Sequence, residues 1–191
     1  MNLSLKIILP VFIITGLAQW LVPAQMIWKH EEVLKKGNTF RFLTEPVDPT
    51  NPFIGKYITL NFKEEIAWVK KGHSFERDQD IYVLLKNDSA GFAHINGITA
   101  NEPTNQAAYV KAKVKYISNY SNNDDSIEVN IDYPFDEFYM EEHKAPKAEA
   151  EYRKANLDSA SSTYAQVKIW KGNAVTENVL IDNKPLTSYF K

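Results

Sequence analysis

Carboxylates are the side chains whose spacing could support chemistry most directly. Six of them lie in one short segment: Asp136, Glu137, Glu141, Glu142, Glu149 and Glu151. Two carboxyl groups at a fixed separation carry out glycoside hydrolysis, one as the acid and the other as base or nucleophile. Five basic residues between positions 143 and 154 are mixed with them, which is typical of a solvated surface. We therefore predict no catalytic residue, and we keep a hydrolase that uses the carboxylates near Glu141 and Glu142 as an alternative.

Other reactive side chains are sparse or wrongly spaced. The histidines are His30, His73, His94 and His143, and no two are three to five positions apart, as a helical metal site requires. The chain has no cysteine, which excludes disulfides, thiolate nucleophiles, zinc-thiolate sites and iron–sulfur clusters. Neither a Gly-x-Ser-x-Gly elbow nor a glycine-rich phosphate loop occurs. We predict no metal site and no cofactor.

Length and charge bound the kind of protein. The chain has 191 residues, which suits one domain plus an appendage. Its 22 basic and 24 acidic residues give a formal charge of −2. Proteins that bind nucleic acid usually carry a strong basic excess, because neutralising phosphates drives that binding. We predict no nucleic-acid partner.

The N-terminal segment has the pattern of a membrane anchor. Residues 7–28 contain no charged side chain. As a helix they span roughly 30 Å, which is the thickness of a bilayer's hydrocarbon core. Lys6 precedes the run, and Trp28, Lys29 and His30 close it with the aromatic and cationic residues typical of a membrane interface. We predict that residues 1–36 form a membrane anchor with a juxtamembrane extension that ends at Gly37.

Two other interpretations of this segment remain. The small residues around Val22 and Ala24 have the spacing of a signal-peptide cleavage site. A buried core helix is disfavoured by the length of the run and by its lack of a polar face. Orientation is weakly determined, because Lys6 favours an inside N-terminus whereas the lysines after Trp28 favour the opposite. We expect an inside N-terminus and an outside domain.

The remainder, residues 37–191, has a β-rich pattern. Alternating or β-branched runs predict strands at 39–44, 57–62 with a possible extension over 65–69, 80–86, 91–99, 109–117, 127–131, 163–170 and 175–181. The last two form a hairpin around residues 171–173. One helix is predicted over 145–157, from its Ala, Glu and Lys content, and we expect it to pack on the outside of a sheet. The fold class is mainly β: an N-terminal transmembrane helix, then a small antiparallel β barrel or sandwich with one inserted helix.

One octapeptide resembles a family signature. The residues Gly55-Lys56-Tyr57-Ile58-Thr59-Leu60-Asn61-Phe62 are similar to the Gly-Asp-Tyr-x-x-Leu-x-Tyr string of the GDYXXLXY family. The Asp-Pro loop at 48–53 and the segments 137–142 and 180–186 are also similar to family features, so the resemblance covers most of the chain. Lys56 replaces the signature Asp, Phe62 replaces its final Tyr, and Asn183 stands where members often have Gly.

The resemblance implies a bacterial membrane-anchored protein of unknown function, often encoded beside polytopic membrane proteins. It implies no reaction, and Lys56 argues that the signature is structural. Gly55 would then permit a turn, and the residues after it would form a strand. The candidate binding residues that the motifs supply are Asp48, Pro49, Gly55, Tyr57, Leu60, Tyr139 and Glu141.

Three functional hypotheses follow. The first is an accessory or interaction protein, held in the bacterial inner membrane by residues 7–28, with a periplasmic domain beside an integral membrane partner. The second is an envelope hydrolase that uses Glu141 and Glu142. The third is a domain that binds an unknown small ligand, with aromatics such as Tyr57 and Phe138 lining a pocket.

Overall fold

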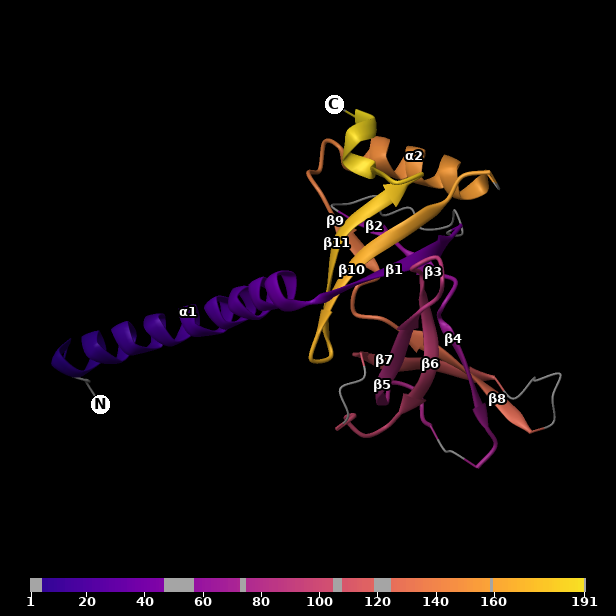
Figure 1. Cartoon of the computed structure of the whole chain (residues 1–191). Coiled ribbons are helices and arrows are strands. Elements are labelled where there is room, and N and C mark those ends of the chain that lie inside the picture. Colours follow the sequence, from indigo (N-terminus) through magenta and orange to yellow (C-terminus); the bar gives the residue numbers. More distant parts are fainter. Residues whose placement is uncertain are drawn as a thin grey trace.

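The computed structural model describes residues 5–46, 57–72, 75–104, 108–118, 125–158 and 160–190. A long helix leads into two β lobes (Figure 1). The elements are α1 (Leu5–Lys36), β1 (Asn38–Glu45), β2 (Tyr57–Thr59), β3 (Asn61–Phe62), β4 (Ile66–Lys70), β5 (Asp80–Asn87), β6 (Ala93–Thr99), β7 (Tyr109–Ser118), β8 (Ser126–Asp132), β9 (Glu137–Tyr139), α2 (Ala145–Leu157), β10 (Thr163–Trp170), β11 (Asn173–Ile181), β12 (Lys184–Pro185) and the 3-10 helix η1 (Leu186–Phe190).

Helix α1 projects away from the β lobes as a single rod (Figure 1). Its 32 residues give a length of about 48 Å. The large apolar side chains between Leu9 and Trp28 are exposed, and the helix is long and apolar enough to cross a membrane. A water-soluble helix would bury one apolar face instead.

The C-terminal end of α1 is fixed to the lobes. Val33 is buried, with 2% of its surface exposed, where α1 packs against β10 and β11. The Gly37 N–H donates the last helical hydrogen bond, to the Val33 carbonyl at 2.8 Å, and α1 ends at Lys36, just before Gly37, as predicted. A Cβ at position 37 would lie 2.4 Å from that carbonyl oxygen and 3.0 Å from the Ile169 nitrogen. Only glycine lets the chain pass from α1 into β1 within one residue.

The first lobe, which we call the hairpin lobe, is built on the sheet β12-β11-β10-β1-β3. Strands β10 and β11 form the predicted hairpin, and its two turn residues Lys171 and Gly172 both have positive φ. That geometry matches the twist of the flanking strands. The Gly172 carbonyl accepts the Lys111 N–H at 2.9 Å, so the hairpin tip is joined to β7 of the other lobe.

Helix α2 spans the predicted residues and covers the hairpin lobe (Figure 1). Its buried residues, Ala145, Ala148, Tyr152 and Ala155, fall on one face. An ion pair of 2.9 Å between Arg153 and Glu149 lies beside this buried face, where the helix meets solvent.

The second lobe, which we call the barrel, has the strand order β4-β8-β7-β5-β6. Its edge strands β4 and β6 approach each other, so the sheet is nearly closed. The mainly β fold with one additional helix is confirmed, and this lobe takes the barrel alternative. Buried side chains alternate along β5 and β7, among them Ile81, Val83, Val110 and Val114, and they fill the interior.

Four aromatic rings join the lobes. Phe42 on β1 packs against Phe62 on β3 with ring centroids 5.5 Å apart. Tyr133 and Phe135, which follow β8, stack at 4.9 Å and both contact Phe42. The Tyr133 hydroxyl donates to the Glu64 carbonyl at 2.8 Å, so the cluster contains no unpaired hydroxyl.

The segment predicted as one strand over 57–62 is divided in the structure. Strand β2 pairs with β9, whereas β3 pairs with β1, and the change of partner occurs at Leu60. The Leu60 N–H donates to the Asp136 carbonyl at 2.7 Å across the break. The predicted extension over 65–69 is also wrong, because Ile66–Lys70 forms a separate strand of the barrel after a turn. Pattern alone gives alternation but not the pairing partner.

The contact of Val33 predicts that α1 is held against the hairpin lobe. Val33→Ser removes roughly 2 kcal/mol of apolar burial, and the last turns of α1 should then detach more often. Trypsin cleavage after Lys35 and Lys36, in the full chain in detergent, should accelerate roughly 30-fold, because cleavage follows the population of the open state. Leu34→Ser, at an exposed neighbouring position, is the control. Equal acceleration in both variants would contradict the contact.

Candidate functional site

The described part of the signature segment forms two short strands, β2 and β3, which pair with different partners. Ile58, Leu60 and Phe62 are all buried, with 1–2% of their surface exposed. Tyr57 and Thr59 alternate with them and are half-buried. The segment pairs first with β9 and then with β1. Leu60, a candidate binding residue, therefore lies in the core and is not accessible to a ligand.

Two other candidate residues are brought together on the surface. Tyr57 and Tyr139 are direct partners in the β2–β9 pair, with ring centroids 5.5 Å apart. Tyr139 is 66% exposed, and its hydroxyl donates to the Glu137 carboxylate, a bond that raises the pKa of the tyrosine. The pair forms an exposed aromatic ledge with one carboxylate.

The contacts of Glu141 are with the start of α2 and not with this pair of tyrosines. Its carboxylate is exposed and pairs with Lys144 at 2.9 Å, and its carbonyl accepts the N–H groups of Lys144 and Ala145. Those bonds organise the turn that begins α2. Asp48, Pro49 and Gly55 lie outside the described residues, so the structure does not place them.

Two partly buried carboxylates lie beside the signature strand. The Glu65 carboxylate accepts the Phe62 N–H at 2.7 Å, and burial raises its pKa. Burial also raises the pKa of Asp136, with a further contribution from the negative charge of Asp132. The nearby Lys115 opposes both shifts. Asp136 belongs to the six carboxylates that the sequence singles out, whereas nothing in the sequence distinguishes Glu65.

A histidine links the edges of the barrel. The His94 Nδ1 atom is 2.7 Å from the Glu64 carboxylate, and its Nε2 atom is 3.5 Å from the Asp88 carboxylate. The other Glu64 oxygen accepts the Ile95 N–H at 2.9 Å. Backbone N–H groups of Phe92 and Ala90 lower the pKa of Asp88. These bonds connect the turn before β4 to β6, and among the described residues no group of three metal-ligating side chains is found.

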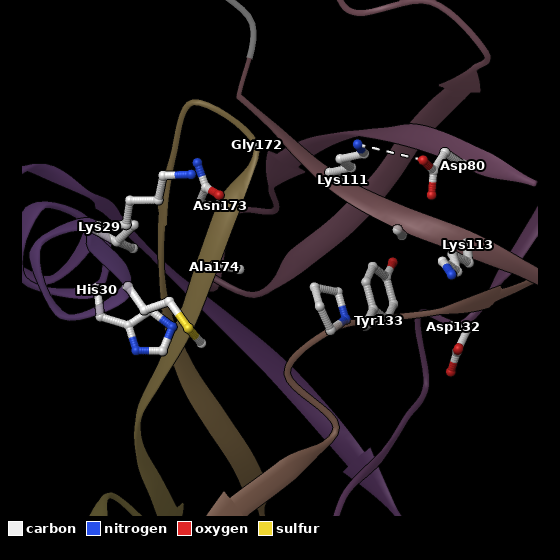
Figure 2. A pocket seen from close by; sticks show the side chains of 14 residues that line it. Lys29, His30, Asp80, Lys111, Lys113, Asp132, Tyr133, Gly172, Asn173 and Ala174 are labelled. Carbon is white, nitrogen blue, oxygen red and sulfur yellow. Dashed lines mark ion pairs between the residues drawn. The ribbon is translucent and has the colours of Figure 1, made fainter. Parts of the chain in front are cut away.

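A groove of about 600 Å³ lies where α1 meets the lobes, and we call it the junction groove (Figure 2). One wall is α1, with Met26, Lys29, His30 and Val33. The others are Asp80, residues 111–113 of β7, residues 132–134, and the hairpin residues 172–174. Lys111 pairs with Asp80 at 3.5 Å. The groove draws on five separate parts of the sequence, so no local pattern predicts it.

A comparison with family models matches residues 19–179 to the GDYXXLXY protein family. The chain belongs to the GDYXXLXY family. Comparisons with curated proteins and with solved structures found no match.

The structure explains one departure from the GDYXXLXY signature. Phe62 takes the place of the final tyrosine, and its ring is enclosed by Phe42, Tyr133 and Phe135. A hydroxyl there would need a buried hydrogen-bond partner. The signature leucine, Leu60, is buried because it lies at the point where the strand changes partner. Lys56 lies outside the described residues.

The raised pKa of Glu65 makes a pH-dependent contribution to stability. A carboxyl whose pKa is higher in the folded state than in the unfolded state stabilises the fold at low pH, and this contribution is lost as the pH rises through the folded pKa. Glu65→Gln keeps an oxygen acceptor for Phe62 and removes the ionisation. The variant should therefore gain in free energy of unfolding relative to wild type, and gain more at pH 7 than at pH 4.

Urea unfolding of the full chain in detergent at the two pH values measures this difference. Glu142→Gln is the control, because that carboxylate is exposed. The assignment would be refuted by a Glu65→Gln gain that is the same at both pH values, or larger at pH 4.

Proposed function

We propose that this GDYXXLXY protein is a single-pass accessory protein of the bacterial inner membrane, whose β lobes lie on the outer face beside an integral membrane partner. The observation that carries the proposal is the contrast along α1. Its apolar side chains from Leu9 to Trp28 are exposed, whereas Val33 is buried in the lobes. An exposed apolar surface of that extent needs a bilayer or a partner to cover it.

The anchor holds the lobes close to the membrane. Trp28, a residue type favoured at membrane interfaces, precedes Val33 by five positions, or about 8 Å along a helix. Because α1 is continuous over this distance, the lobes begin within two helical turns of the lipid headgroups. A domain held at that height can contact the outer parts of a neighbouring membrane protein.

The barrel carries a surface suited to such a partner. Ile66 and Tyr116 flank Asn130 in one row across β4, β8 and β7, and Trp68 occupies the next outward position on β4. Trp68 is 60% exposed, and Ile66 and Tyr116 are also exposed. We call these three side chains the barrel patch. Tryptophan and tyrosine are enriched where protein surfaces bind each other.

The hydrolase alternative receives less support. Glu141 is exposed and paired with Lys144, and neither Glu141 nor Glu142 lines the junction groove. General acid–base work needs a carboxyl within reach of a bound substrate. The contacts of Glu141 instead organise the turn before α2.

Protease treatment tests the orientation. Proteinase K added to intact spheroplasts should digest the lobes and leave an α1 fragment in the membrane. Protection until the spheroplasts are lysed would place the lobes in the cytoplasm and overturn the proposed orientation. The mass of the membrane-bound chain tests the cleavage alternative, because processing after Ala24 would remove most of the apolar segment.

Copurification tests the barrel patch. Ile66→Ser combined with Trp68→Ser should reduce recovery of a polytopic membrane protein at least tenfold, because it removes two exposed apolar contacts without touching the core. Leu157→Ser, which alters an exposed apolar residue on α2, should leave recovery unchanged. Recovery of a lone monomer with the wild-type chain in several mild detergents would count against any partner.

A further inference from the structure

We propose that the junction groove binds the phosphate-bearing headgroup of an anionic phospholipid. The inference rests on the membrane anchoring proposed above and gives the anchored protein a specific ligand. Its basis is the position, charge and size of the groove, taken together.

The groove lies at the depth of the headgroups. Met26 belongs to the uncharged run that the bilayer would cover, and Val33 belongs to the contact with the lobes. These residues are seven positions apart, or about 10 Å along the helix, which compares with the several ångströms of a headgroup layer. Lys29 and His30 lie between them. A lipid beside α1 would therefore have its phosphate at the level of Lys29.

Basic side chains approach the groove from both sides. Lys29 and His30 extend from α1, and Lys111 and Lys113 extend from β7 (Figure 2). Asp80 neutralises Lys111 at 3.5 Å. Among the described residues, Lys29 and Lys113 have no ion pair within 4 Å, so their ammonium groups are available to an anion. Asp132, opposite Lys113 in the β7–β8 pair, limits the excess positive charge and favours one phosphate over several.

The remaining lining fits the neutral part of a lipid. Met26 and Val33 on α1, with Pro134 and Ala174 across the groove, give apolar surface beside the lysines. A volume of about 600 Å³ lies in the range of sites that hold small ligands. Basic pockets between transmembrane helices bind anionic headgroups through their charge. The junction groove adds apolar surface to that charge. A free phosphate would use the lysines but not the apolar surface.

Lipid titration of the full-length chain in detergent tests the proposal. Phosphatidylglycerol adducts are counted by native mass spectrometry, with phosphatidylcholine as the zwitterionic comparison. Lys29→Gln combined with Lys113→Gln should weaken phosphatidylglycerol binding roughly 30-fold, since each lysine near an anionic surface contributes about a fivefold factor. Phosphatidylcholine binding should be unchanged. Both lysines are exposed, so the variant should retain the thermal unfolding midpoint of wild type.

The control is Lys70→Gln combined with Lys86→Gln, which removes the same charge from exposed positions outside the groove. Equal loss of phosphatidylglycerol binding in both double variants, or no loss in either, would overturn the site. A separate titration with inorganic phosphate distinguishes the source of the anion. If phosphate alone binds with the same dependence on Lys29 and Lys113, the ligand is a soluble phosphate compound and the lipid assignment is wrong.

A different measurement tests the anchoring on which the inference depends. Alkaline carbonate should leave the full chain in the membrane fraction. Extraction without detergent would defeat the proposed function itself. Retention of the chain together with lysine-independent lipid binding would defeat only the headgroup site.

Discussion

Four aromatic rings, from Phe42, Phe62, Tyr133 and Phe135, hold the hairpin lobe and the barrel together. Each buries roughly 150–250 Å², and each favourable ring pair adds about 0.5–1.5 kcal/mol beyond that burial. A single backbone hydrogen bond between the lobes contributes only about 1 kcal/mol net. The cluster therefore dominates the junction, and the bond from Lys111 to Gly172 mainly fixes the register of the hairpin tip on β7.

The need to place Phe62 in this aromatic cluster explains the family signature in physical terms. The chain must run along β9, cross to β1 and deliver Phe62 to the aromatic cluster within a few residues. Small shifts at Leu60 would move Phe62 to the wrong face, because side chains alternate along a strand. A motif under that geometric requirement can persist in a family without contacting any ligand. Within the described part of the signature, solvent reaches the half-buried side chains, among them Tyr57, whose ring contacts the exposed Tyr139 on β9.

The elements that sequence predicts well are those whose pattern is local. The hairpin around Lys171 and Gly172, the helix over 145–157 and the barrel strands other than β4 follow from alternation, turn residues and helix composition. The division at Leu60 does not, since it depends on Asp136, which is 76 positions away. The same reason hides the contact of His94 with Glu64 and the burial that raises the pKa of Glu65.

The candidate functional residues likewise divide into those that sequence motifs supply and those that only the folded chain brings together. Motif resemblance supplies Tyr57 from the signature, and Tyr139 and Glu141 from the segment before α2, and the structure shows the two tyrosines in contact. The junction groove escapes such reasoning, because Lys29 and Lys113 come from segments 84 positions apart. Only the packing of α1 on the hairpin brings them to one cleft.

If α1 crosses a bilayer as proposed, the joint at Gly37 determines how a tilt of the helix affects the β lobes. One residue separates α1 from β1, and both neighbouring segments are held against β10, by the buried Val33 on one side and by the pairing of Asn38 with Ile169 on the other, so the joint has little freedom to bend. Transmembrane helices tilt to match their apolar length to the thickness of the bilayer. With a stiff joint, a change in tilt would be passed to both lobes as a rotation. In the proposed membrane orientation, the inclination of the lobes would therefore change with the thickness of the bilayer.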